Sequence, residues 1–353
     1  MDHPTTPPLS HLLPWALPRP IQVGFALAAA LFLGALGMGI VANQRSQEQA
    51  IQSELATLSL LSERLAYQVD AYLSRTRTLA VHLSLTENAE RFLATPKPPA
   101  AQVEAFNRWL DRQVEAEYGL SAVFVMAPDG TCMASSNRPF IGRNFGFRPY
   151  FQKAAAGKAN LNDWFIGSVT KTPRISAASP VFSQQRTIGV LVTEYEVEDL
   201  EKSVRSFGQT GRTAFLANHH GVVLSHSRPE LSLTVLEPLA PPVVEELART
   251  RQFLGRSFGP FPASADLARA FRATLDEGSS RTVRFTQEGQ TKWSALSPLK
   301  GHFWVAGVTV PEETVLAPGG SAWRANLGLG LVFSLATFLL LLALLEGLRR
   351  RRS

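Results

Sequence analysis

Two long apolar stretches, one near each end of the chain, constrain the fold more than any other feature. The first runs without a charge from Ile21 to Ala42, and the second, richer in leucine, runs from Ala325 to Leu345. At about 1.5 Å per residue, the first would form a helix about 33 Å long, enough for a hydrocarbon core of roughly 30 Å. We therefore predict transmembrane helices at residues 21–42 and 325–348.

A cleaved signal peptide is the alternative for the first stretch. Such peptides have a shorter apolar region of about 7–15 residues behind a basic start, and here only Arg19 precedes it. An uncleaved anchor is the better interpretation.

The charge distribution predicts how the chain is oriented. Four of the six net positive charges are the arginines at 349–352, which leaves only +2 for the rest and disfavours a nucleic-acid partner. Basic residues beside a span stay on the cytoplasmic side, so the tail at 349–353 is expected inside. With two spans, the leader at 1–20 is also cytoplasmic, and residues 43–323 face the periplasm.

A long helix is predicted directly after the first stretch. Apolar residues recur at steps of three and four from Ile51 to Leu83, with Phe92 continuing the pattern before Pro96. We predict one helix over about 44–95, and the alternative is a break near Ser84. The long helix is expected to pack on its own domain and on a second copy, which makes a homodimer.

The remainder of the middle region reads as a duplicated β-rich module. After a helical stretch at 103–118, two apolar runs flank Asp129-Gly130, a strong hairpin signal. Aligning Gly130 with Gly221 also superimposes Phe124 on Phe215 and Ser136 on Ser227. We predict an α+β fold with two modules, membrane-distal at about 103–200 and membrane-proximal at about 205–310. Each is expected to be a short antiparallel sheet with helices to one side.

This arrangement resembles the double Cache (tandem PAS-like) extracytoplasmic sensor domain of bacterial receptors. The stretch GRNFGFRPYFQKAAAG, residues 142–157, is similar to the ligand loop of C4-dicarboxylate sensor kinases, where an aromatic-Arg-Pro-aromatic run precedes a helix. The resemblance covers about residues 43–310. It implies a receptor in the bacterial inner membrane that signals in response to a small carboxylate-bearing ligand, either an amino acid or a C4-dicarboxylate.

The same stretch supplies the first candidate ligand contacts. A guanidinium can hold a carboxylate through two parallel hydrogen bonds, and aromatic neighbours supply apolar walls and a hydroxyl donor. We therefore expect Arg148 and Tyr150, with Phe147 and Phe151, to bind the ligand. This expectation depends mainly on the resemblance to the sensor family. The alternative is that Arg148 pairs with a structural acid and Tyr150 fills the core.

The following strands supply the remaining candidates. Thr172 and Ser176 offer hydroxyls, although Pro173 interrupts the alternation that would assign their faces. Glu194 shares a face with Val190 and Val192. In dicarboxylate sensors the matching position carries a lysine, which would meet the second carboxylate of the ligand. An acid at this position instead resembles the Cache sensors of amino acids, in which an acidic side chain meets the amino group of the ligand. The alternative is a solvated Glu194.

Catalytic and metal chemistry are not predicted. The adjacent His219 and His220 on a turn do not converge on one ion, the single Cys132 suits a core position, and we expect no cofactor. No kinase sequence follows Leu348, so the output is expected from a separate histidine kinase or other partner. A non-signalling binding or scaffold module and a truncated sensor kinase are the alternatives.

Overall fold

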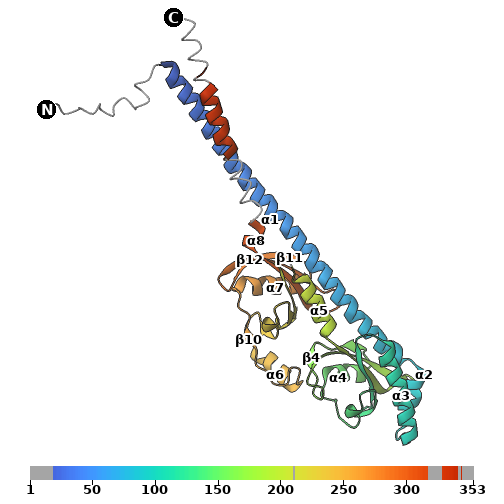
Figure 1. Ribbon diagram of the computed structural model, residues 1–353. Coiled ribbons are helices and arrows are strands. Elements are labelled where there is room, and N and C mark those ends of the chain that lie inside the picture. Colours follow the sequence, from blue (N-terminus) through green and yellow to red (C-terminus); the bar gives the residue numbers. More distant parts are fainter. Residues whose placement is uncertain (1–18, 210, 317–327, 341–342, 344–353) are drawn as a thin grey trace, which may run out of the picture. The chain divides into compact units, whose positions relative to one another are not determined.

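The computed structural model describes residues 19–209, 211–316, 328–340 and 343 (Figure 1). Three predicted segments lie wholly or partly outside these residues. They are the leader, of which only 19–20 are described, the whole basic tail, and part of the second predicted span. Within the described residues, no helix is both long enough and apolar enough to cross a membrane. One compact unit comprises residues 55–311, and the other comprises the described parts of 1–54 and 312–353.

Helices and strands succeed one another in two similar blocks. The helices are α1 (Arg19–Ser84), α2 (Glu87–Leu93), α3 (Ala100–Ala116), α4 (Pro149–Ala155), α5 (Glu198–Phe207), α6 (Pro241–Arg249), α7 (Ala265–Glu277) and α8 (Glu312–Leu316), with 3-10 turns η3 (Arg138–Phe140) and η4 (Pro229–Leu231). The strands are β1 (Leu120–Met126), β2 (Cys132–Ser135), β3 (Asn160–Leu161), β4 (Phe165–Ile166), β5 (Pro173–Ser183), β6 (Arg186–Glu196), β7 (Thr213–Asn218), β8 (Val223–His226), β9 (Thr234–Val235), β10 (Gly259–Pro260), β11 (Arg281–Gln287), β12 (Gln290–Pro298) and β13 (Trp304–Pro311).

The strand order shows that one sheet plan is used twice. The first sheet runs β2-β1-β6-β5-β3, with β4 also paired to β5, and the second runs β8-β7-β13-β12-β11. Each sheet begins with a hairpin, and both hairpins carry a bulge at the corresponding point. We call residues 120–196 with their covering helices the first module, and residues 213–311 the second module. The predicted duplication is therefore present in the structure.

A matching hydrogen bond fixes the first hairpin of each module. The N–H of Val123 donates to Ser136 Oγ over 3.0 Å, and the N–H of Ala214 donates to Ser227 Oγ over the same distance. Both serines stand just after the second strand of the hairpin, where the strand ladder ends. The aligned serines in the sequence thus perform the same structural task.

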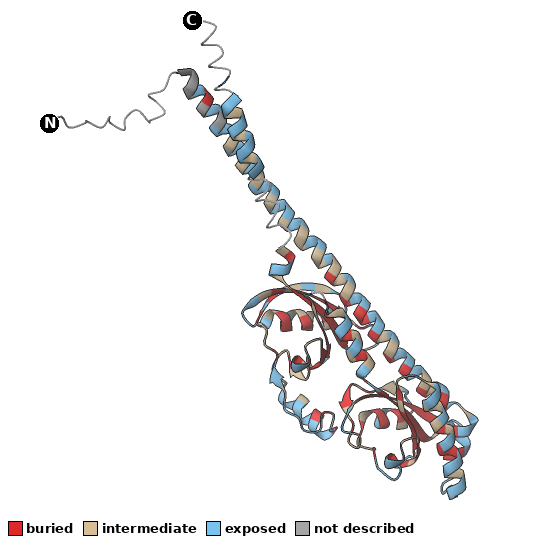
Figure 2. Ribbon diagram, in the orientation of Figure 1, coloured by how far each residue is buried: buried red, intermediate tan, exposed pale blue. Residues whose placement is uncertain are grey.

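Helices cover both faces of the first sheet, which corrects the prediction that they lie to one side. Leu191 and Tyr195 of β6 pack with residues of α2 and α3, whereas Val190 and Val192 pack against α4. The strands are accordingly buried almost throughout (Figure 2). Because both faces of β6 are apolar, both need a covering layer.

Helix α1 ends at Ser84 rather than continuing to about residue 95, so the predicted long helix is wrong at this end and the alternative is correct. Thr86 leaves the helical conformation, and its Oγ1 accepts a hydrogen bond from the N–H of Ala89 over 3.4 Å. This side-chain cap begins a new helix, α2. The Ser84 hydroxyl donates to Ser179 Oγ over 2.8 Å, which attaches the end of α1 to β5.

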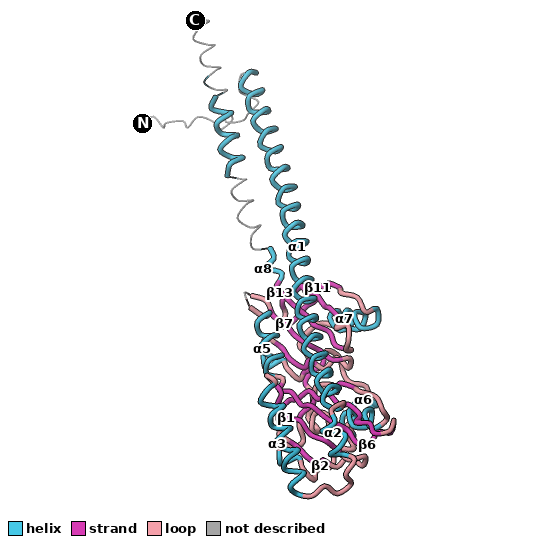
Figure 3. The backbone as a smooth tube through the Cα atoms, turned by 90° about the vertical axis from the view of Figure 1, so that its right-hand side faces the viewer, coloured by secondary structure: helices cyan, strands magenta, loops and turns pink. Residues whose placement is uncertain are grey.

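From residue 55 onward α1 lies alongside both sheets (Figure 3). Besides the Ser84 contact with the first module, the Ser62 and Ser297 hydroxyls are 2.7 Å apart at the second. The N–H of Gly301 donates to Asp70 Oδ1 over 2.9 Å. One helix therefore contacts both modules through buried or partly buried polar groups.

Candidate ligand-binding site

Glu194 is a buried acid near the centre of the first sheet. Strand pairing places it opposite Ala122 on one side and Ser176 on the other, and only 5% of it is exposed. The Ser176 hydroxyl donates to Glu194 Oε1 over 3.4 Å. The alternation predicted from the sequence is correct, and the solvated alternative is excluded because the carboxyl is buried.

The environment of Glu194 favours its neutral form more than water does. Burial raises the pKa of this carboxyl to about 7, although the guanidinium groups of Arg174 and Arg148 act in the opposite direction. Arg174 is itself mostly buried and donates to Glu196 Oε1 over 2.6 Å. Glu194 therefore titrates near neutral pH.

Arg148 occupies the residue before α4, where Pro149 begins the helix. Its side chain is buried, and Nη1 donates to the carbonyls of Thr250 and Arg251, both over 3.2 Å. Nη2 donates to the carbonyl of Ile166 over 3.4 Å. Among the described residues these acceptors are all carbonyls, so Arg148 does not pair with a structural acid. Burial lowers its pKa.

The Nε–H of the Arg148 guanidinium stays available. The three bonds are made by Nη1 and Nη2, and none of the hydrogen bonds among the described residues uses the Nε–H. In a guanidinium, Nε–H and one Nη2–H lie on the same edge and form a fork that suits a carboxylate. The rings of Phe147 and Phe165 lie 5.1 and 4.7 Å from the guanidinium carbon and hold its plane.

Three of the predicted residues line one cavity. Its volume is about 10 Å³, and its wall consists of Phe140, Phe145, Arg148, Tyr150, Phe165, Gly167, Ser168, Val169, Thr170 and Glu194. This volume is room for about one water molecule, so the site is closed in this structure. Tyr150 is fully buried, and burial raises its pKa, which keeps the hydroxyl protonated as a donor.

The other predicted residues lie outside that wall. Phe147 packs against the Arg148 guanidinium, Phe151 belongs to the core beneath α4, and Ser176 reaches the site only through Glu194. Thr172 is exposed and away from the cavity. Its carbonyl accepts a hydrogen bond from the N–H of Gly167 over 2.9 Å, closing a turn that carries Thr172 past the wall.

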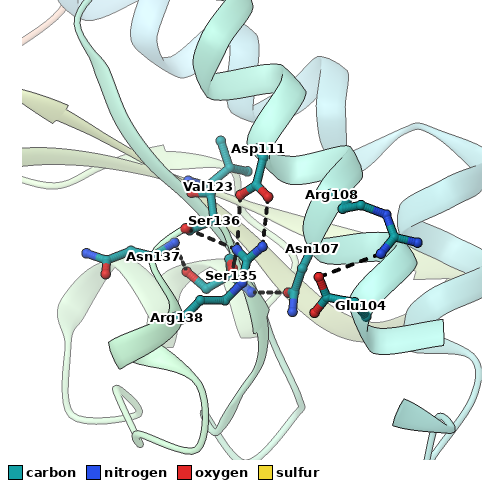
Figure 4. Close-up of polar contacts among 9 residues, drawn as sticks. All are labelled: Glu104, Asn107, Arg108, Asp111, Val123, Ser135, Ser136, Asn137 and Arg138. Atoms are coloured by element: carbon teal, nitrogen blue, oxygen red, sulfur yellow. Dashed lines mark hydrogen bonds and ion pairs between the residues drawn. The ribbon is translucent and has the colours of Figure 1, made fainter. Parts of the chain in front are cut away.

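Sequence reasoning missed several wall residues. Thr170 Oγ1 is buried and has no hydrogen-bond partner among the described residues, which makes it a candidate ligand contact. Phe140 lies in η3, which is anchored by two Arg138 to Asp111 hydrogen bonds of 3.0 and 2.7 Å (Figure 4). The density of aromatic residues between 140 and 151 was the available signal. Nothing in the sequence pattern showed that Phe165 returns to them.

No metal centre accompanies this site among the described residues, where no three or more His, Cys, Asp or Glu side chains are placed to hold an ion. Cys132 lies in the core on the cavity side of the sheet, and burial raises its pKa to about 12.

Two curated relatives are similar in sequence, and both are C4-dicarboxylate transport sensor proteins called DctB. The protein from Pseudomonas aeruginosa is 30% identical over 153 residues, which are 42% of this chain and 24% of that protein. The protein from Rhizobium meliloti is 25% identical over 286 residues, which are 77% of this chain and 45% of that protein. The chain thus spans less than half the length of these relatives.

Solved structures show the same fold. The sensor domain of the Vibrio cholerae histidine kinase DctB superimposes with a TM-score of 0.63 at 20% identity, over 74% of this chain and 98% of that one. The sensory domain of the Campylobacter jejuni chemoreceptor Tlp3, solved with isoleucine bound, gives a TM-score of 0.55 at 14% identity, over 77% and 97%. The Cache domain model matches residues 42–318, and the chain belongs to the Cache domain family of sensor domains.

Proposed function

We propose that this chain is a membrane-anchored sensor whose first module binds an α-amino acid between Arg148 and Glu194. The observation that carries the proposal is that a buried cation and a buried acid line the same small cavity. A zwitterion supplies a carboxylate for the unused Nε–H of Arg148 and an ammonium for Glu194. Each buried charge then gains the partner that its desolvation requires.

The remaining wall suits an aliphatic side chain with few polar groups. Phe140, Phe145 and Phe165 provide apolar surface, while the hydroxyls of Tyr150 and Thr170 offer donors and acceptors. This combination of apolar lining and a few convergent polar groups is typical of small-molecule sites. The Tlp3 domain solved with isoleucine shares the fold, which supports the ligand class without fixing it.

A C4-dicarboxylate is the second candidate, and the pKa of Glu194 favours it. With a pKa of about 7, Glu194 is protonated in a substantial fraction of molecules at neutral pH. A protonated Glu194 can donate to a second carboxylate, so it need not repel it. The DctB relatives are named for this ligand class.

A thermal-shift titration of the full chain in detergent micelles separates the two ligands. L-Isoleucine should stabilise more at pH 8 than at pH 6, because its ammonium needs ionised Glu194. Succinate should do the opposite, because it needs protonated Glu194. A ligand at one hundred times its Kd stabilises by about 2.7 kcal/mol.

Glu194→Gln is the matched variant for this titration. It should abolish the pH dependence for both probes and weaken L-isoleucine more than succinate. Absence of a shift with any standard amino acid or C4-dicarboxylate at either pH would overturn the proposed function.

The cellular arrangement is also a proposal. The apolar stretches at 21–42 and 325–348 would anchor the chain, with both termini in the cytoplasm and the two modules, about 103–200 and 205–310, in the periplasm. The family match to a sensor domain supports a periplasmic location. We propose a homodimer that signals to a histidine kinase or another partner. Protease digestion of sealed spheroplasts should cleave the modules and spare an epitope at the C-terminus.

A further inference from the structure

Asp163 joins the two modules through hydrogen bonds to neutral donors. The residue lies between β3 and β4 of the first module. Trp304 Nε1 donates to its Oδ1 over 2.8 Å, and Asn218 Nδ2 donates to its Oδ2 over 2.8 Å. Both donors belong to the second module, and both are buried. A carboxylate held by oriented neutral donors forms strong charge-assisted hydrogen bonds.

Gln252, just after α6, holds the same segment of the first module at three more points. Its Nε2 donates to Asp163 Oδ2 over 3.3 Å and to the carbonyl of Trp164 over 2.8 Å. Its own carbonyl accepts the N–H of Ile166 over 2.7 Å. The carbonyls of Thr250 and Arg251 beside it accept Arg148, so the loop after α6 binds both Arg148 and the segment at 163–166.

This segment continues directly into the wall of the ligand cavity. Residues 163, 164 and 166 contact the second module, whereas Phe165 and residues 167–170 line the cavity. Because the cavity holds only about 10 Å³, an amino acid or a dicarboxylate can enter only if part of this wall moves. Where Phe165 and residues 167–170 are the part that moves, they cannot move far while every bond of residues 163, 164 and 166 to the second module stays in place.

The receiving end in the second module is a pair of neighbouring strands. Trp304 is the first residue of β13 and is paired directly with Asn218, the last residue of β7. Strand β13 ends at Pro311, and α8 follows at Glu312. A displacement of Asp163 therefore acts on the strand from which the chain leaves the second module.

We propose that Asp163, Gln252 and Arg148 form a polar link that couples occupancy of the first-module cavity to the position of β13. The inference rests on the proposed function, in that it takes this cavity as the ligand site. The closed cavity with an intact link is one state, and the open cavity with a rearranged link is the other. A ligand biases this equilibrium through its different affinity for the two states.

The single cysteine of the chain reports opening of the cavity without any ligand. Cys132 is 1% exposed and lies in the core that also contains Phe140, Phe145 and Tyr150. Its rate of reaction with 5,5′-dithiobis(2-nitrobenzoate) measures how often that core opens. The full chain in detergent micelles is used, and a thermal melt of each variant checks global stability.

Trp304→Phe is the test variant, since it keeps an aromatic side chain and removes the indole N–H that donates to Asp163. Thr309→Val is the matched control, because it lies on the same strand, is equally buried, and loses a hydrogen bond to Ser294 Oγ within the second module. We expect Trp304→Phe to accelerate Cys132 labelling by about tenfold or more, as loss of a charge-assisted hydrogen bond allows, and Thr309→Val to leave the rate within about twofold.

Asp163→Asn is the second variant and should accelerate labelling at least as much as Trp304→Phe. Equal labelling rates for Trp304→Phe and Thr309→Val would overturn the proposed link. Acceleration by Asp163→Asn alone would also overturn it, because opening of the cavity would then not be coupled to the second module. The assay contains no ligand. If no ligand bound but Trp304→Phe still opened the cavity, the proposed function would fail while the link itself stood.

Discussion

The two modules share one sheet plan and differ in the polar groups buried within it. Pairing through the aligned hairpins places Glu194 at the position of Thr309, and Ser176 at that of Ser294. In the first module the pair is an acid and a hydroxyl 3.4 Å apart, and the acid lines a cavity together with Arg148. In the second module Thr309 donates to Ser294 Oγ over 2.9 Å, which satisfies both neutral groups.

The buried cations of the two modules differ in the same way. Arg174 corresponds to Lys292, and both are mostly buried. Arg174 pairs with Glu196, whereas Lys292 Nζ has the amide oxygen of Gln287 at 3.2 Å, and burial lowers its pKa. The second module thus retains a cation without the acid that would complete a zwitterion site.

Cavity size alone would point to the second module, not to the one that carries the proposed site. The second module is bordered by a cavity of about 810 Å³ against α7, far larger than the closed one in the first. Several of its charged wall residues already have partners: Arg272 is paired with Glu237, Arg269 with Asp266, and Glu277 with Arg281. The proposed function therefore rests on polar groups without partners in the first module, and not on cavity volume.

Truncating an aromatic core residue at matching positions tests whether the sheets of the two modules are equally important for stability. Of the predicted changes, this one should lower the free energy of unfolding most. Phe124 and Phe215 occupy aligned positions and are almost fully buried. We expect Phe124→Ala and Phe215→Ala each to lower the free energy of unfolding by about 3–5 kcal/mol, through lost burial and a residual cavity. Urea unfolding of each variant measures this. A loss below 1 kcal/mol for either variant would show that the two aligned positions are not equivalent in the two modules.

Removing the charge of Glu194 should stabilise the ligand-free protein, and only at high pH. The folded pKa of about 7 lies above the ordinary value of 4.5, so the folded state binds more protons between these values and loses stability as pH rises through them. Glu194→Gln should therefore add about 3 kcal/mol at pH 8 and close to nothing at pH 4.5. Urea unfolding across this range measures the effect.

Thr309→Val is the control for that pH series, because it removes a neutral hydroxyl at the matching position. Its effect on the free energy of unfolding should be the same at pH 4.5 and pH 8. A pH-independent effect of Glu194→Gln would mean that the carboxyl is not desolvated in solution, and the contrast between the modules would be lost.

The sequence was informative where the pattern was local. Two-residue alternation placed Glu194 on the face of Val190 and Val192, and the glycine-centred hairpins revealed the duplication. The break after Ser84 was harder, because apolar spacing continues across it and the decisive signal is the cap at Thr86. Periodicity does not register a cap that interrupts an otherwise continuous helical face.

Contacts between segments distant in sequence could not be predicted. Arg148 was expected to face an acid or a ligand, but three of its hydrogen bonds go to carbonyls at 166, 250 and 251. Thr172 was a candidate because of its hydroxyl, and alternation could not assign its face next to Pro173. The structure leaves it outside the cavity because the chain turns between Gly167 and Thr172. Asp163 sits in a stretch with no periodic pattern, so its role depends wholly on where the second module lies.

The smallest expected effect tests the repeated hairpin bond. Ser136→Ala and Ser227→Ala each remove an acceptor for one backbone N–H, at 3.0 Å in both modules. We expect each to lower the free energy of unfolding by about 1 kcal/mol, because a partly buried amide loses its partner. Equal losses of unfolding free energy in urea would show that the two hairpins match in energy as well as in geometry. If Ser136→Ala cost much more, the first hairpin would depend on additional contacts around Arg138, and the two hairpins would have to be treated as different structures.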